Sequence, residues 1–209
     1  AIDAMKSAIS LPVTIKCRIG VDHFDDYEFL QHFIQVNKDS GCNVFIIHAR
    51  KAWLKGLSPK QNREIPELIY DRVYKIKNEF PELHIGINGG VTSIGQIEEH
   101  VPHIDEVMIG RAAYQSPLFL RELAVWQGAD QEKLLTIEQV VDAMREYAAR
   151  EYKENNTPLH SIARHMMGLF QGMPGARSWR QNLSRISVDR TQDSGRLLEA
   201  IPKKNVTLL

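Results

Sequence analysis

The chain has 209 residues, with 26 Lys and Arg against 26 Asp and Glu, and 43% of its residues are hydrophobic. This balance excludes intrinsic disorder, and no stretch has the roughly 18 uninterrupted apolar residues of a membrane span. The cysteines Cys17 and Cys42 form neither a disulfide framework nor a CxxC metal site. We therefore expect no metal, no membrane association and a reducing, cytoplasmic compartment. Zero net charge argues against bulk nucleic-acid binding unless the charge is unevenly distributed.

The N-terminal residues have the pattern of a helix already in progress. Residue 1 is Ala, and Ile2, Met5 and Ile9 lie at helical spacing that runs directly into Pro12. We therefore expect the chain to begin inside a domain and to be the C-terminal portion of a longer protein.

Short apolar runs alternate with helical patterns in the first half of the chain. The runs are residues 13–15, 44–47, 84–87 and 106–109, and they predict buried parallel strands. Asp25 or Asp26 can cap the first intervening helix, Pro66 suits the start of the second, and Thr92 or Ser93 can cap the third. This βαβαβαβ order is an α/β pattern that fits half of an eight-stranded barrel or half of a doubly wound sheet.

The strand pattern stops after Pro117. Residues 136–139 have capping-box spacing and predict a long helix that reaches about Asn155. Further helical stretches, separated by Pro158 and by residues 172–175, predict a small all-α helical bundle. We expect three segments, which are an α/β domain at 1–125, a helical domain at 126–200 and a tail at 201–209.

Polar residues or glycines follow each predicted strand. They are Lys16 and Arg18, then His48 and Arg50, then Asn88, Gly89 and Gly90, and finally Gly110 and Arg111. In a TIM barrel the ligand binds at the C-terminal ends of the strands, and phosphate binds on the loops after strands seven and eight. Gly89, Gly90 and Gly110 would let backbone N–H groups approach a phosphate, while Arg111 adds positive charge. The predicted strands would then be five to eight, and strands one to four would precede this chain.

Strand alternation assigns side chains to the two faces of the sheet. Lys16 and Arg18 share one face, whereas Cys17 lies on the other. Cationic side chains belong in the polar mouth of such a site, so we expect Cys17 to pack against the helices as a small buried residue. His48 has the same parity as Ile46 and comes last in its strand, so we expect it at the mouth.

In this order and at these strand ends, the motifs resemble those of the tRNA-dihydrouridine synthases, and more closely the synthase A subfamily. The resemblance covers essentially all residues up to about 190. It rests on Val-Thr-Ile-Lys-Cys-Arg-Ile-Gly at 13–20, Phe-Ile-Ile-His-Ala-Arg at 45–50, Ile-Asn-Gly-Gly at 87–90, Met-Ile-Gly-Arg-Ala at 108–112, and the helical segments 165–170 and 174–177.

The resemblance implies an enzyme that reduces uridine to 5,6-dihydrouridine in the tRNA D-loop, at positions 20 and 20a, with FMN recharged by NADPH. It implies that Lys16 and His48 contact the flavin. It also implies that FMN is held, chiefly around its phosphate, by Asn88, Gly89, Gly90, Gly110 and Arg111. A cation near the N1 and C2 carbonyl of the flavin would stabilise the anionic reduced ring.

The family's proton donor is a cysteine in the loop after the fourth strand. This chain does not contain that segment, and neither Cys17 nor Cys42 matches the donor. The resemblance therefore assigns no catalytic residue to this chain, and we expect the chain alone to be inactive.

Two segments are locally basic although the net charge is zero. The loop at 51–65 carries Lys51, Lys55, Lys60 and Arg63 against Glu64, with Trp53 among them. Residues 160–190 contain arginines 164, 177, 180, 185 and 190, with Asp189 as the single acid. Such clusters suit backbone phosphates, although a solvated surface is the alternative. The resemblance places tRNA recognition at Lys60, Arg63, Arg177 and Arg180, so tRNA is the expected partner and no protein partner is implied.

Two other functions remain open. The first is an FMN-dependent TIM-barrel oxidoreductase that acts on a free small molecule, against which the basic segment 160–190 argues. The second is a non-catalytic RNA-binding fragment whose half-barrel is only a scaffold. It stays open because half a barrel exposes strand edges and has an incomplete flavin pocket.

Overall fold

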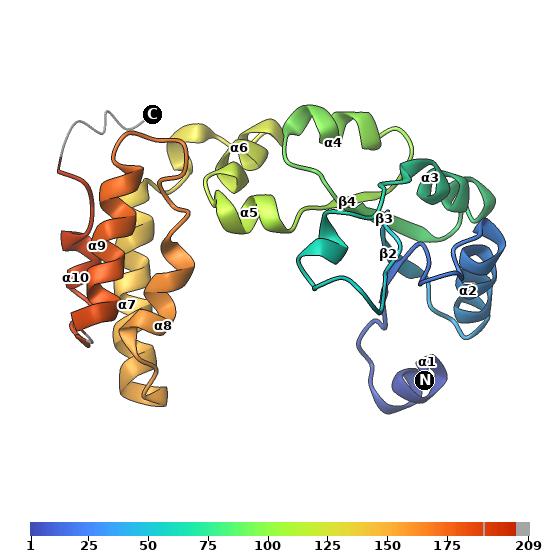
Figure 1. Ribbon diagram of the computed structural model, residues 1–209, viewed down its shortest axis with the longest axis horizontal. Helices are drawn as coiled ribbons and strands as arrows, with labels where there is room; N and C mark the ends of the chain where they lie inside the picture. Colours follow the sequence, from blue (N-terminus) through green and yellow to red (C-terminus); the bar gives the residue numbers. More distant parts are fainter. Residues whose placement is uncertain (190, 204–209) are drawn as a thin grey trace. The chain divides into compact units, whose positions relative to one another are not determined.

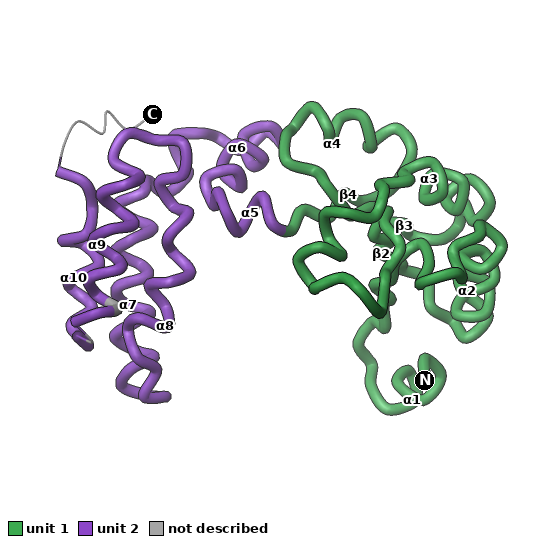
Figure 2. The backbone as a smooth tube through the Cα atoms, viewed as in Figure 1, with its two compact units in different colours: residues 1–110 green, residues 111–209 purple. Residues whose placement is uncertain are grey.

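The structure, a computed structural model, describes residues 1–189 and 191–203 (Figure 1). The chain divides into two compact units, Ala1–Gly110 and Arg111–Leu209, which Figure 2 colours separately. This division falls before the boundary expected at 125 and 126, because the short helices after Gly110 group with the second unit. Of the expected tail at 201–209, residues 204–209 lie outside the described residues, as does Arg190 of the basic segment. The assignment of a flavin-binding and a tRNA-binding domain stays a prediction.

The first unit is a parallel α/β sheet with helices. Its elements are α1 (Ile2–Ala8), β1 (Ile15–Arg18), α2 (Tyr27–Asp39), β2 (Val44–His48), η1 (Gln61–Arg63), α3 (Tyr70–Glu79), β3 (His84–Asn88), α4 (Ile94–His100) and β4 (Glu106–Met108). All pairings are parallel, in the order β1-β2-β3-β4. This confirms the predicted α/β pattern, and the order is common to half a barrel and half a doubly wound sheet.

Helix caps fix where the helices of this unit begin. Asp26, one of two expected candidates, caps α2 by accepting a hydrogen bond from the Phe29 amide at 2.6 Å. Ser93 caps α4 in the same way, with the Gln96 amide at 3.3 Å. These short polar side chains satisfy amides that have no partner within the helix.

Two elements differ from their predicted positions. The first strand is Ile15–Arg18 rather than residues 13–15, because its pairing with β2 runs from Ile15 opposite Phe45 to Arg18 opposite His48. The helix expected from Pro66 begins only at Tyr70. The reason is that the Ile69 amide donates to the Ala49 carbonyl at 2.8 Å, which ties this segment to the chain beyond β2.

The core of the first unit lies between one face of the sheet and the helices α2 and α3. Phe45, Ile47, Ile85 and Ile87 are fully buried there, together with residues of both helices. Cys17 packs against the same core, and burial raises the pKa of its thiol to about 12. The expectation that Cys17 faces the packed helices is therefore confirmed.

The second unit contains helices and no strand among residues 111–189 and 191–203. Its elements are α5 (Arg111–Gln115), α6 (Phe119–Trp126), η2 (Gln131–Lys133), α7 (Ile137–Asn155), α8 (Leu159–Ala163), η3 (Arg164–Met166), α9 (Ala176–Asp189) and α10 (Arg196–Glu199). The predicted capping box at Thr136 and Gln139 is present at the start of α7. Buried Trp179 lies in the core and donates to the Met166 carbonyl at 2.8 Å. Within the described part of the chain, no helix has the length and apolar content needed to cross a bilayer.

Candidate functional site

The strand register brings several predicted residues together at the carboxyl end of the sheet. Arg18 of β1 is opposite His48 of β2, and His48 is opposite Asn88 of β3. Lys16, which is opposite Ile46, lies two residues before Arg18 and therefore on the same face of the sheet. Because Cys17 and Ile47 occupy the core face, Lys16 and His48 lie on the face that α2 and α3 do not cover. The structure thus places these side chains as strand alternation predicts.

Lys16 and Asn88 form a direct hydrogen bond across the sheet. The Lys16 Nζ lies 3.0 Å from Asn88 Oδ1, and Asn88 Nδ2 donates to the Met108 carbonyl at 2.8 Å. Both functional atoms of the Asn88 amide are therefore engaged, which fixes its orientation. Lys16 is exposed on this face, yet partial desolvation lowers the pKa of its amine. The nearby Cys17 raises this pKa by a smaller amount, and the positive charge of Arg18 lowers it further. A negatively charged ligand group beside Lys16 would stabilise the ammonium form.

Gly89 and Gly90 make a turn directly after β3. Their φ angles are +121° and +74°, which L side chains rarely adopt. A Cβ on Gly89 would lie 2.7 Å from His48 Cδ2, and one on Gly90 would lie 2.6 Å from Leu68 Cδ1. The expected reason for these glycines was room for a phosphate. The structure adds a different reason, since the backbone conformation and the packing of His48 and Leu68 already require glycine.

Two residues that contact this turn were not predicted as site residues from the sequence. Tyr70, the first residue of α3, donates from its hydroxyl to the Gly89 carbonyl at 2.7 Å, and Leu68 lies against both glycines. Leu68 falls in the stretch after Pro66 for which the sequence predicts a helix. Leu68 reaches Gly89 because the segment before α3 is not helical. The sequence predicts a helix there, so this contact could not be expected.

Gly110 and Arg111 differ from the glycine turn. Gly110 has no positive φ, and no heavy atom lies within 4 Å of a Cβ built on it. Neither backbone strain nor packing within the chain therefore requires glycine there. Arg111 opens α5 in the second unit and is exposed. The contribution of Arg111 to a common site with Gly89 stays a prediction.

The basic loop at 51–65 is held to the end of β1. Arg18 donates to the carbonyls of Lys51 and Asn62 at 2.8 and 2.9 Å. Lys51 pairs with Asp25 and lies 4.5 Å from the centre of the Trp53 ring. Lys60 and Arg63, the predicted tRNA contacts, are exposed on η1 and the residue before it.

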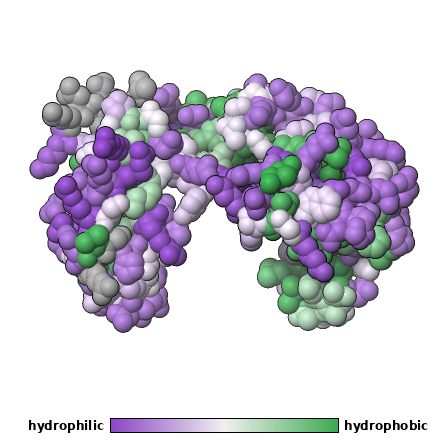
Figure 3. All heavy atoms as spheres, viewed as in Figure 1, coloured by the Kyte–Doolittle hydropathy of each residue, from purple (hydrophilic) through white to green (hydrophobic). Residues whose placement is uncertain are grey.

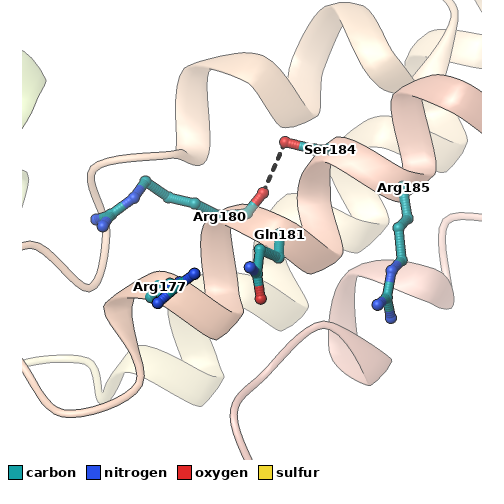
Figure 4. Close-up of a pocket in the computed structure, with 5 residues that line it drawn as sticks. All are labelled: Arg177, Arg180, Gln181, Ser184 and Arg185. Atoms are coloured by element: carbon teal, nitrogen blue, oxygen red, sulfur yellow. Dashed lines mark hydrogen bonds between the residues drawn. The ribbon is translucent and has the colours of Figure 1, made fainter.

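Arginines of α9 line an open depression of about 390 Å³ (Figure 4). Its lining residues are Arg177, Arg180, Gln181, Ser184 and Arg185. Arg177 and Arg180 are exposed, as surface contacts for an anion must be. Figure 3 shows hydrophilic residues over most of the visible face of this unit. By contrast, Arg164 lies on η3 and donates to the His165 ring at 3.1 Å.

Among the described residues there is no group of three or more His, Cys, Asp and Glu side chains that could hold a metal ion. The polar groups at the carboxyl end of the sheet include the Lys16 amine, the Arg18 guanidinium, the His48 imidazole and the Asn88 amide, together with backbone amides. Such groups suit an anionic or hydrogen-bonding organic ligand.

Comparison with known families gives the class of this protein. The profile described as Dihydrouridine synthase (Dus) matches residues 1–205. The chain therefore belongs to the dihydrouridine synthase family, a family of flavin-dependent oxidoreductases.

Individual relatives place the chain with the subfamily that the motifs resemble. A tRNA-dihydrouridine(20/20a) synthase of Shewanella oneidensis is 51% identical over 183 residues, which are 88% of this chain and 54% of the relative. Proteins of the same name from Vibrio vulnificus and Salmonella typhi are 50% and 48% identical, over 87% and 96% of this chain and 56% and 60% of their own lengths. The chain thus spans a little over half the length of these relatives.

Proposed function

We propose that this chain is the flavin-binding and tRNA-binding part of an enzyme that uses FMN and NADPH to reduce uridine to 5,6-dihydrouridine in the tRNA D-loop, at positions 20 and 20a. The observation that carries the proposal is the convergence of Lys16, His48 and Asn88 beside the Gly89–Gly90 turn, on the sheet face that α2 and α3 leave uncovered. Family membership supplies the reaction class.

The sheet is proposed to be strands five to eight of a TIM barrel, followed by a helical tRNA-binding domain. Each half of a doubly wound sheet has apolar side chains on both faces, because helices cover both. Here the face opposite the core carries Lys16, His48, Asn88 and Glu106, which favours the interior of a barrel mouth. A barrel also explains why the ligand residues gather at the carboxyl ends of the strands.

The residues present fit FMN, which when bound would supply the hydride chemistry. Lys16 would provide a cation beside the flavin ring, and Asn88 holds the Lys16 ammonium in place through its Oδ1. His48, next to the glycine turn, would contribute a hydrogen bond. Backbone amides of Gly89 and Gly90, with Gly110 and Arg111, would bind the phosphate.

The proton donor is proposed to lie outside this chain. The Cys17 thiol is on the core face, and burial raises its pKa to about 12, which opposes formation of a thiolate. Cys42 is buried, with its thiol directed at the carbonyls of Val13 and Val44. Neither thiol is therefore suited to give a proton to a base at the barrel mouth.

The tRNA would be held by Lys60 and Arg63 on the first unit and by Arg177 and Arg180 on α9. A uracil ring inside folded RNA must be extruded before it can reach a flavin, at a cost of a few kcal/mol. Arginine contacts to phosphates elsewhere on the tRNA can offset this cost, since the guanidinium fork binds phosphate bidentately.

The test uses a whole-length protein, in which this chain is joined to the part of the family's length that it does not span. We expect a flavin absorption spectrum after purification, and dihydrouridine in tRNA after incubation with NADPH. Flavin reduction without any tRNA binding would instead favour an oxidoreductase of small molecules. Binding of tRNA without flavin would favour a non-catalytic RNA-binding protein.

A further inference from the structure

The glycine turn after β3 cannot be held by its own backbone preferences. Glycine adopts positive and negative φ almost equally, so Gly89 and Gly90 gain no rigidity from their local conformation. The turn therefore needs an external restraint. Tyr70 is placed to supply one, because its hydroxyl donates to the Gly89 carbonyl at 2.7 Å.

This hydrogen bond also determines where the next amide points. In a trans peptide the carbonyl and the following N–H point in opposite directions, and the structure has no cis peptide bond in its described residues. Because the Gly89 carbonyl is turned toward Tyr70, the Gly90 N–H is directed away from it. Loss of the Tyr70 hydroxyl would free the Gly89–Gly90 peptide plane to rotate.

The Tyr70 ring is itself held by an aromatic cluster between α3 and α4. It meets the His100 ring edge-on, with the ring centres 4.5 Å apart. His100 is 3% exposed, and its Nδ1 lies 2.6 Å from the Tyr74 hydroxyl. Burial lowers the pKa of His100, so the neutral ring that can accept from Tyr74 is favoured. Because burial holds the His100 ring, its edge-on contact aims the Tyr70 phenol at the turn.

We propose that Tyr70 is a positioning residue that fixes the Gly89–Gly90 peptide so that its amide is ready to bind the phosphate group of FMN. The inference rests on the proposed function, since it takes FMN as the ligand. Its physical basis is pre-organisation, because a turn that is already ordered loses less entropy when the ligand binds. Tyr70 would act through the backbone and would not touch the ligand.

The variants that test the role of Tyr70 each delete one hydroxyl group. Tyr70→Phe removes the bond to Gly89 and keeps the ring against His100. Tyr74→Phe is the matched control, because it removes a hydroxyl group from the same helix, and the hydrogen bond of that hydroxyl goes to His100 and not to the turn. Circular dichroism and thermal unfolding of both variants establish that the fold is retained.

The measurement is the dissociation constant of the whole-length apoprotein for FMN and for riboflavin, which lacks the phosphate, by flavin fluorescence. We expect Tyr70→Phe to weaken FMN binding by about threefold to tenfold, the equivalent of one hydrogen bond, and to change riboflavin binding by less than about twofold. Tyr74→Phe should leave both constants within about twofold. A purely structural role of Tyr70 would weaken both ligands equally.

The outcomes separate this inference from the proposed function. Three results would overturn the positioning role while flavin binding stands. Tyr70→Phe could leave the FMN affinity unchanged, it could weaken riboflavin binding as much as FMN binding, or Tyr74→Phe could weaken FMN binding as much as Tyr70→Phe does. Failure of the unsubstituted protein to bind FMN would overturn the proposed function, and the role of Tyr70 with it.

Discussion

Lys16 on β1 reaches across β2 to Asn88 on β3, where its Nζ lies 3.0 Å from the Asn88 Oδ1 although the residues are 72 positions apart in the sequence. The same amide group donates to the Met108 carbonyl on β4. One asparagine therefore connects the cation of the first strand to the last strand of the sheet, and it sets the position of that cation.

The Lys16 charge is the first feature to test. Lys16→Met keeps the length of the side chain and removes its charge and its hydrogen bond to Asn88. We expect FMN affinity of the whole-length protein to fall about tenfold, because hydrogen bonds to charged groups contribute roughly 1.5–3 kcal/mol. Lys133→Met, at a side chain that is 83% exposed, is the control. Equal flavin dissociation constants for the two variants would remove Lys16 from the site.

Gly110 and Gly90 should respond differently to alanine. Gly110→Ala meets no neighbouring atom and needs no unusual φ, so the free energy of unfolding should change little while FMN affinity falls. Gly90→Ala forces an alanine to φ +74° against Leu68, and should cost about 1–2 kcal/mol of stability even without ligand. Urea unfolding and flavin titration of both variants check this. An FMN affinity of Gly110→Ala equal to the parent's would show that no ligand approaches Gly110.

The α9 arginines are tested through the salt dependence of tRNA binding. Replacing Arg177 and Arg180 with Ala should weaken binding and reduce the salt slope by roughly 0.7–0.9 for each phosphate that the protein no longer neutralises, while flavin-dependent NADPH oxidation persists. The double variant Arg145→Ala, Arg150→Ala on α7 removes the same charge and serves as the control. If the two double variants have the same slope, net charge alone explains the effect and the α9 arginines are a solvated surface.

The acid stability of the first unit should depend on Asp105. Partial burial acts to raise the pKa of Asp105, but the hydrogen bonds from Lys77 and from the Ile85 amide, with Lys77 at 2.8 Å, bring it below its ordinary value. A carboxyl group whose pKa is lower in the folded than in the unfolded chain stabilises the fold at pH values above its unfolded pKa of about 3.9. This stabilisation is lost as the pH falls through the pKa of the folded state. Asp105→Asn should therefore lower the free energy of unfolding by about 1 kcal/mol at pH 7.

Urea unfolding of Asp105→Asn and the parent at several pH values tests this sign. The difference between the two proteins should shrink below about pH 4, where the carboxylate of the unfolded chain is protonated. A difference that grows toward low pH would contradict the assignment.

The isolated 209-residue chain should form no dihydrouridine in tRNA when supplied with FMN and NADPH. The expected proton donor is absent from it, and the thiols of Cys17 and Cys42 lie on the buried side of the sheet. Nucleoside analysis of treated tRNA by mass spectrometry is the measurement, and the whole-length protein is the positive control. Dihydrouridine above background would show that a residue of this chain donates the proton.

Local sequence patterns predicted the order of the four strands and the helices between them, the face of Lys16 and His48, and the capping box at Thr136. These features depend on local rules, namely apolar periodicity, alternation along a strand and side chains that bind nearby amides. The motifs at the strand ends also identified the family, which the family profile confirms.

Local patterns could not predict the start of β1, the late start of α3 or the surroundings of the glycine turn. Each depends on a partner far away in the sequence. Phe45 sets the beginning of β1, the Ala49 carbonyl holds Ile69 outside the helix, and Tyr70 and Leu68 pack on Gly89 and Gly90. A local pattern contains no information about such contacts, because they form only when the parallel strands bring separate segments together.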